Sequence, residues 1–334
     1  MSCTHRVLSP VSNYVARRRY IYVDDLVLYR PLGDMMDMCI TILSAEFEME
    51  YLGTVKWLLG IHIEINKQGI SLSQQKYVDD ILRRFHMEEC NSVTTPADHN
   101  VKLSEQGDEP PADLTLYLQL IGSLMYLVTY TRPDLAFIVT RLSQFNKCPS
   151  TLHMAQAKRV LRYLKGTRDK KLLYPFQQTF SLLAYSDSDY AGCSDTRKST
   201  SGYIMQFGES TISWRSKKQG IVTLSTCEAE YVALSVCARE LLWLQKALDE
   251  LLTEFIPMLT YCDNRGTIDN ASNQKINEKS KHIDMIYHFM QEKIEDGTIT
   301  LLHVPSVNNL ADICTKGLAK PLFETHCDSL FHGR

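Results

Sequence analysis

Apolar residues recur at helical spacing in several stretches of the first half of the chain. In the segment 151–165, Ala157, Val160, Leu161 and Leu164 fall on one side of a helix. Similar spacing predicts further helices over 34–50, 74–86, 113–128 and 133–145. Runs rich in β-branched and aromatic residues predict two hairpins, at 20–29 and 57–72.

A polar stretch near 166–179, with a glycine, several cations and a proline, interrupts this pattern. After it, β-rich runs predict strands at 181–186, 201–207, 211–216, 258–262 and 298–304. Helical spacing predicts helices at 225–251, 265–271, 280–296 and from 308 onward. Three consecutive strands followed by alternating helices and strands indicate a mixed α/β fold, with helices layered on a sheet.

Composition narrows the class of protein. The 36 basic and 39 acidic side chains give a formal net charge of −3, which excludes a strongly basic nucleic-acid coat protein but not a local basic patch. The start lacks the apolar segment of a signal peptide, and the longest apolar stretch is too short to span a membrane. Ten cysteines without C-x-x-C spacing then indicate reduced thiols rather than a zinc ribbon. We therefore expect an intracellular protein of the cytoplasm or nucleus, not secreted and without a membrane partner.

Four carboxylates lie at the turning points of the second half. Asp187 ends its first strand, Glu230 lies in the first turns of the long helix, Asp263 follows the strand 258–262, and Asp312 opens the last helix. Ligands of α/β sheets gather at the carboxyl ends of strands, so we expect these acids to converge. Crowded carboxylates repel one another unless cations hold them, which predicts a pair of Mg²⁺ ions about 4 Å apart.

Each acid taken singly is also compatible with an ordinary surface residue or a helix N-cap. Their shared placement weakens that interpretation, since all four fall where strands end or helices begin. Two neighbours, Glu228 and Asp189, remain alternatives because each lies two residues from Glu230 or Asp187.

Several short strings stand out along the sequence: YVDD at 22–25, LGIHI at 59–63, IGSLMYL at 121–127, TRPD at 131–134, LRYLKGT at 161–167, RKSTSGY at 197–203, ISW at 212–214, EAEY at 228–231 and LADI at 310–313. Together these strings resemble copia-type LTR-retrotransposon Pol polyproteins, at the end of the reverse transcriptase and in the ribonuclease H domain. They occur in the family's order, and the resemblance spans about residues 20–318.

The resemblance implies an α/β fold: a ribonuclease H-like mixed sheet with helices, preceded by a truncated reverse-transcriptase palm and a mainly helical thumb/connection region. It also implies hydrolysis of the RNA strand of RNA–DNA hybrids with two divalent ions, Mg²⁺ or Mn²⁺. Asp187, Glu230, Asp263 and Asp312 match the family's four catalytic, metal-binding acids. An RNA–DNA hybrid or another nucleic acid is then the expected partner.

On this basis we expect five segments. They are an unassigned start (1–19), a partial reverse-transcriptase palm/thumb (20–100), a helical connection region (101–178), a ribonuclease H-like domain (179–320) and a tail (321–334).

The YVDD string resembles the reverse-transcriptase turn that presents two acids, here Asp24 and Asp25, to metal ions. Polymerase chemistry also needs a third carboxylate from an earlier strand, and the 23 residues before Asp24 contain no Asp or Glu. We therefore expect Asp24 and Asp25 to be remnant polymerase ligands, and this chain alone not to polymerise DNA.

Cations are concentrated near the end of the predicted helix 151–165. The fourteen residues from 158 to 171 hold seven basic residues and one acid, a local charge of +6. Such stripes bind phosphate backbones, and hydroxyls beside cations hold single phosphates. The candidate nucleic-acid contacts are Lys158, Arg162, Lys165, Arg197 and Lys198. The alternatives are a solvated helix face and an exposed turn.

Three interpretations compete with an active nuclease. A catalytically inactive nucleic-acid-binding remnant would bind hybrids in a salt-dependent way without turnover. A reverse-transcriptase subunit would work only with an upstream Pol fragment that supplies the missing acid. An inert product of a decayed element would give no stable protein.

Overall fold

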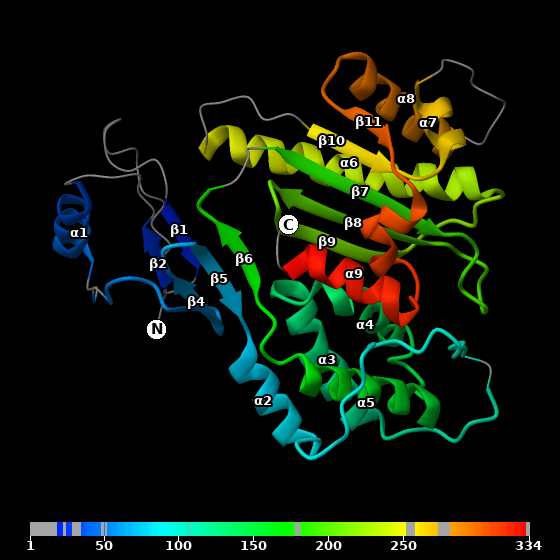
Figure 1. The fold of residues 1–334 in the computed structure, drawn as a ribbon, viewed down its shortest axis with the longest axis horizontal. Coiled ribbons are helices and arrows are strands. Elements are labelled where there is room, and N and C mark those ends of the chain that lie inside the picture. The colour runs from blue at the N-terminus through cyan, green and yellow to red at the C-terminus, as the bar shows by residue number, and fades with distance from the viewer. Residues whose placement is uncertain are drawn as a thin grey trace. The chain divides into compact units, whose positions relative to one another are not determined.

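The computed structural model comprises two units, residues 1–58 and 59–334 (Figure 1). The structure describes residues 19–22, 25–28, 35–47, 50, 52–105, 107–177, 181–251, 258–272 and 281–331. The first unit contains an antiparallel hairpin, β1 (Arg19–Tyr22) and β2 (Asp25–Leu28), then α1 (Met35–Glu46) and β3 (Trp57–Leu58). The first predicted hairpin is thus confirmed, with Asp24 outside the described residues.

A small antiparallel sheet and a group of helices open the second unit. The strands β4 (Ile61–Ile65), β5 (Gly69–Ser73) and β6 (Leu172–Pro175) pair in that order. The helical elements are α2 (Gln75–Arg84), α3 (Leu114–Tyr130), the 3-10 turn η1 (Pro133–Leu135), α4 (Ala136–Ser143) and α5 (Thr151–Gly166). The sequence pattern predicts these helices to within a few residues, but not β6, because four residues are too few to show a period.

A five-stranded sheet forms the centre of the second unit. Its strands are β7 (Leu182–Asp189), β8 (Thr200–Phe207), β9 (Ser210–Lys218), β10 (Met258–Cys262) and β11 (Thr300–His303). Their order is β11-β10-β7-β8-β9. The first three strands in the sequence pair antiparallel, whereas β10 runs parallel to β7 and β11. The predicted mixed α/β sheet is confirmed.

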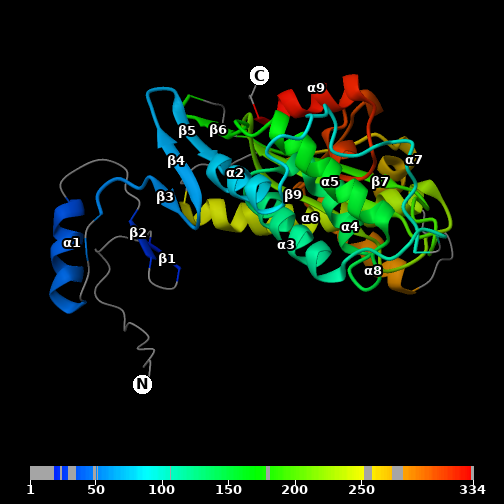
Figure 2. The ribbon, with the colours of Figure 1, turned by 90° about the horizontal axis from the view of Figure 1, so that it is seen from below.

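Both faces of this sheet are covered. The helix α6 (Thr226–Leu251) packs on β7 and β8 from one face, and the 3-10 turn η3 (Leu310–Cys314) and helix α9 (Lys320–Phe331) pack from the other (Figure 2). Tyr203 and Met205 of β8 accordingly lie in the core beneath α6, and Ile204 between them lies in the core shared with α9. Successive strand residues point to opposite faces, and because both faces are covered, β8 is buried nearly throughout. The helices α7 (Arg265–Ser272) and α8 (Lys281–Glu295) follow β10.

The segment after β11 differs from the prediction. In place of one helix from residue 308, the chain forms two short 3-10 turns, η2 (Ser306–Asn308) and η3, and then α9. Asn309 sets this local structure, because its side chain accepts a hydrogen bond from the N–H of Ala311 (3.3 Å) and donates one to the carbonyl of Ser186 (3.0 Å). Asp312 therefore lies in a 3-10 turn and not at the start of an α-helix.

One hydrophobic core extends from α3 and α5 under β8 to α9. Most of the segment expected as a tail, 321–334, lies in α9 and contributes Phe323 and Leu330 to that core. The five-segment division stays a prediction, and the structure's own division falls after residue 58. Within the described part of the chain, no helix is both long and apolar enough to cross a bilayer.

Candidate active site

The structure brings the four predicted acids together at the carboxyl ends of β7 and β10. Asp187 lies near the end of β7, Glu230 in the second turn of α6, Asp263 directly after β10, and Asp312 in η3. Single carboxylate oxygens of Asp187, Asp263 and Asp312 lie within 4.8 Å of one another, and Glu230 lies equally close to Asp263. We call these four residues the acid cluster.

Strand order and a glycine position two of the acids. Because β7 and β10 are parallel neighbours, Asp187 and Asp263 emerge at the same end of the sheet. Asp187 pairs across the sheet with Gly202, where a Cβ would lie only 2.8 Å from the Cβ of Cys314. Glycine at this position therefore allows η3 to approach the sheet and bring Asp312 beside Asp187.

Two residues of the site that the sequence analysis did not identify follow η3. Lys316 places its Nζ 3.0 Å from Asp312 Oδ1 and 3.7 Å from Asp187 Oδ2. The hydroxyl of Thr315 donates a hydrogen bond to Asp187 Oδ2. Burial alone would lower the pKa of Lys316, but the Asp187 and Asp312 carboxylates outweigh burial and raise it. The spacing of four residues between Asp312 and Lys316 is the signal that could have indicated this ion pair.

The acids carry more negative charge than the chain compensates. Burial raises the pKa of Glu230 well above its usual range, and Asp187 and Asp263 raise it further. Burial, followed by the charge of Asp187, raises the pKa of Asp312 to about 7. The N–H of Ser188 donates to Glu230 Oε1 (3.2 Å), whereas Glu230 Oε2 is buried without a hydrogen-bond partner among the described residues.

The alternative acids have other surroundings. Glu228 accepts a hydrogen bond from the N–H of Leu224 (2.6 Å), and its own N–H donates to Ser225 Oγ (3.2 Å). This arrangement closes the first turn of α6 in the manner of a capping box. Glu230, which lies two residues further along α6, faces the other acids instead. Asp189 lies beside Asp187 and Lys316, and burial raises its pKa.

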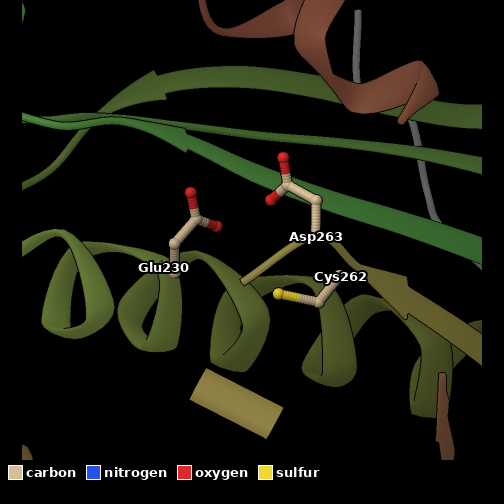
Figure 3. A group of neighbouring side chains, drawn as sticks. All are labelled: Glu230, Cys262 and Asp263. Atoms are coloured by element: carbon tan, nitrogen blue, oxygen red, sulfur yellow. The ribbon is translucent and has the colours of Figure 1, made fainter. Parts of the chain in front are cut away.

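A cysteine also contacts this site. Cys262, the last residue of β10, holds its Sγ within 4.8 Å of ligand atoms of Glu230 and Asp263. Figure 3 shows the Glu230 side chain projecting from α6 toward Asp263, with the thiol of Cys262 on the same side of its strand as α6. Cys262 is fully buried, and burial raises the pKa of its thiol. In the sequence, the position of Cys262 directly before Asp263 could have indicated that it lies at this site.

One of the predicted nucleic-acid contacts lies next to the acid cluster. Arg197 lines a cavity of about 370 Å³ together with Asp189 and Lys316. Arg197 is exposed and has a left-handed backbone conformation (φ 54°). Lys198 differs, because its Nζ donates a hydrogen bond to the carbonyl of Gly220 and so holds two loops together.

The cations around α5 are partly neutralised by acids from distant parts of the sequence. The ion pairs are Arg159–Asp98 (3.7 Å), Arg168–Asp79 (3.5 Å) and Lys171–Glu64 (3.0 Å). Of the predicted contacts, Arg162 donates through Nε to the carbonyl of Asn91 (2.8 Å), and Lys158 is exposed. Lys165 is half-buried. Nucleic-acid binding by Lys158, Arg162 and Lys165 stays a prediction.

Comparisons with known proteins place the chain in a family. Residues 18–99 match the family described as reverse transcriptase (RNA-dependent DNA polymerase). The retrovirus-related Pol polyprotein from transposon RE1 of Arabidopsis thaliana is 36% identical over 313 residues, which cover 93% of this chain and 21% of that polyprotein. The putative transposon Ty5-1 protein of Saccharomyces cerevisiae is 31% identical over 223 residues, which cover 66% of this chain and 72% of that protein. The chain belongs to the copia-type retrotransposon Pol family.

This copia-type chain spans about a fifth of the length of the RE1 polyprotein (21%). Among solved structures, an N-terminal RNase H domain from Mycobacterium tuberculosis is similar over 45% of this chain and 99% of the solved chain, with 14% identity and a TM-score of 0.31. Within the matched residues 18–99, Tyr22 of β1 pairs with Asp25 of β2. The roles of Asp24 and Asp25 as remnant ligands stay predictions, since Asp24 lies outside the described residues.

The copia-type string at 131–134 forms a buried ion pair in the helical part of the chain. Arg132 donates to Asp134 through Nε (2.9 Å) and Nη2 (2.7 Å), and to the carbonyl of Thr167 through Nη1 (3.1 Å). The hydroxyl of Tyr163 donates to Asp134 Oδ2 (2.6 Å). This motif therefore connects η1 to the end of α5. It differs from the acid cluster, in which the carboxylates are not each paired with a cation.

Proposed function

We propose that the acid cluster hydrolyses the RNA strand of RNA–DNA hybrids, at internucleotide phosphates, with two divalent cations. The observation that carries this proposal is the convergence of four carboxylates from β7, α6, the end of β10 and η3. Membership in the copia-type Pol family supports the choice of a nucleic acid as the substrate.

The residues fit Mg²⁺ or Mn²⁺. Both ions prefer oxygen ligands, and the acid cluster offers carboxylates from Asp187, Glu230, Asp263 and Asp312. Glu230 Oε2 is buried without a hydrogen-bond partner among the described residues, so a cation would supply the missing interaction. The raised pKa values of Glu230 and Asp312 point the same way, because a bound cation would replace the protons that relieve the repulsion.

Bound there, the ions would supply an activated water and neutralise charge that develops on the phosphate. The chain's own residues fix the carboxylates before substrate arrives. Thr315 and Lys316 hold Asp187, Lys316 also holds Asp312, and the N–H of Ser188 holds one oxygen of Glu230. Such prior orientation lowers the cost of reaching the reactive geometry. Arg197 lines the same cavity as Asp189 and Lys316 and would contact a phosphate of the bound strand.

The test is cleavage of an end-labelled RNA–DNA hybrid with Mg²⁺, with Mn²⁺ and with a chelator. We expect metal-dependent cleavage of the RNA strand by the wild type, a loss of at least ~100-fold in Asp187→Asn, and none of a DNA duplex. The matched control is Glu228→Gln, which alters an acid outside the acid cluster. Cleavage that persists in the chelator, or that is equal in Asp187→Asn, would contradict the proposal.

The second part of the proposal concerns polymerisation. We infer that this 334-residue chain by itself does not extend a primer, because the residues before Asp24 hold no acid that could complete a polymerase metal site. A template-directed primer-extension assay with Mg²⁺ is expected to give no product. Extension by the purified chain would overturn this inference, and extension only after addition of an upstream Pol fragment would favour a polymerase subunit.

A further inference from the structure

We propose that Glu230, Cys262 and Asp263 form a thiolate-containing site for zinc, or another soft divalent cation, that overlaps the Mg²⁺ position and blocks it. The binding part of this inference stands on the geometry of these three residues. The inhibitory part rests on the proposed nuclease activity, and the two are tested separately below.

The geometry suits a small tetrahedral ion. The three ligand atoms, one from each residue, lie within 4.8 Å of one another (Figure 3). Zinc bonds of about 2.0–2.3 Å to oxygen and sulfur place neighbouring ligands of a tetrahedron roughly 3.4 Å apart. Small rotations of the Glu230 and Asp263 side chains about their single bonds would bring the three ligand atoms to this spacing.

An unsatisfied atom is aimed into this site. Glu230 is only 6% exposed, and its Oε2 has no hydrogen-bond partner among the described residues. Cys262 is fully buried beside it, and Asp263 is half-buried, which leaves one open side to the ligand set. Three protein ligands with an open fourth position form the arrangement of zinc sites that retain a bound water.

The sulfur atom decides which metal this site favours. Mg²⁺ takes oxygen ligands and leaves a thiol alone, whereas zinc takes thiolate, imidazole and carboxylate together. On binding, the Cys262 thiol would release its proton to water and bond to the metal through Sγ. The other group of possible ligands in the described residues, Asp187, Asp263 and Asp312, contains no sulfur. Zinc bound to Cys262, Glu230 and Asp263 would use two of the four carboxylates of the proposed Mg²⁺ site, and so would displace the Mg²⁺ ion that those two carboxylates hold.

Cobalt tests the binding part without any activity measurement, because Co²⁺ replaces zinc and gives a near-ultraviolet charge-transfer band only when a thiolate is bound. We expect the metal-free wild type to show this band when Co²⁺ is added, and we expect an excess of zinc to remove it. Cys148→Ser, which alters an exposed cysteine, is expected to keep the band. Cys262→Ser is expected to lose it.

Two further variants keep the binding test decisive. Cys262→Ala removes the sulfur without adding a hydroxyl, and circular dichroism establishes that each variant is folded. Glu230→Gln is expected to keep the thiol but weaken cobalt binding at least ~10-fold. An undiminished band in both Cys262→Ser and Cys262→Ala would overturn the site.

Inhibition is measured as the zinc concentration that halves hybrid cleavage in excess Mg²⁺, with each variant normalised to its own rate without zinc. We expect that concentration to rise at least ~10-fold in Cys262→Ser, and to be unchanged in Cys148→Ser. Equal inhibition of wild type and Cys262→Ser would overturn the inference while leaving the nuclease intact. No cleavage by the wild type would overturn the proposed function, whereas the cobalt band would still decide the metal site.

Discussion

The Arg132–Asp134 pair and the acid cluster both bury charge, but they differ in how that charge is compensated. The side chains of Arg132 and Asp134 are 2% and 0% exposed, and each charge faces an opposite charge at hydrogen-bond distance. Burial alone would raise the pKa of Asp134, but Arg132 outweighs burial and holds the pKa below its usual range. This carboxylate is therefore fully satisfied by the chain.

Among the residues that the structure describes, Lys316 is the one cation that forms ion pairs within the acid cluster of four carboxylates. Burial, and then the repulsion between the acids, raises the pKa values of Glu230 and Asp312, whereas Arg132 lowers the pKa of Asp134. A buried ion pair contributes to a fold only when its partners are complete, and removing one partner is strongly destabilising. The comparison thus separates a structural pair, complete within the chain, from a group of acids whose charge the described residues leave largely uncompensated.

The largest expected effect breaks the complete pair. Asp134→Asn leaves the buried Arg132 without its counter-charge, and the free energy of unfolding should fall by about 3–5 kcal/mol. Urea denaturation of the metal-free protein measures this change. The double variant Arg132→Met with Asp134→Leu is the control, and it should recover part of the loss. A fall below ~1 kcal/mol in Asp134→Asn would mean that the pair is not the structural element described.

The same isosteric change in the acid cluster should act in the opposite direction on stability. Burial, together with the charges of Asp187 and Asp263, disfavours the ionised carboxylate of Glu230, so the metal-free protein should become more stable at pH 8 in Glu230→Gln. The same variant should lose hybrid cleavage and the rise in melting temperature caused by Mg²⁺. A loss of stability comparable to that of Asp134→Asn would contradict the distinction between the two sites.

The pH dependence of stability follows from the same electrostatics. The pKa of Asp312 is about 7 in the folded chain, above the usual value of an aspartate. At a pH between these two values, the folded chain therefore holds a proton that the unfolded chain has released. The free energy of unfolding of the metal-free protein should therefore fall between about pH 5 and about pH 7, where the folded state binds more protons. Saturating Mg²⁺ should remove this fall, because the cation takes the place of the proton.

Urea denaturation at pH 5, 6, 7 and 8, with and without Mg²⁺, measures this dependence. Asp312→Asn is the control, and its metal-free curve should be flatter than that of the wild type. A wild-type curve that rises from pH 5 to 8 without metal would show that the acid cluster does not dominate the titration.

Local patterns in the sequence were sufficient for most elements of the second unit. The helix α5 has a full apolar stripe and a capping serine, Ser150, so its start was predictable to the residue. Asp187, Glu230 and Asp263 were recognisable because each one lies in or directly after a regular strand or helix, whereas Asp312 lies in a 3-10 turn where the sequence pattern predicted an α-helix. In contrast, β6 has only four residues and is defined by its pairing with β5, which is about a hundred residues earlier in the sequence.

Contacts between distant segments account for what the sequence did not indicate. Thr315 and Lys316 reach Asp187 only because Gly202 lets η3 approach the sheet. Similarly, a count of charges along α5 cannot show that Glu64, Asp79 and Asp98 neutralise three of its neighbouring cations. Local charge density indicates a nucleic-acid contact only when the partners of each cation are known.

The smallest expected effect concerns two glutamates two residues apart. Glu228 accepts a hydrogen bond from the N–H of Leu224 at the start of α6, whereas Glu230 faces Asp187 and Asp263. Glu228→Gln should cost about 0.5–1 kcal/mol of stability through a weaker cap, and hybrid cleavage should stay within about twofold of the wild type. Denaturation and cleavage measured on the same preparations test both outcomes. If Glu228→Gln abolished cleavage while Glu230→Gln retained it, the helical metal ligand would be Glu228, and the unpaired Oε2 of Glu230 would need another explanation.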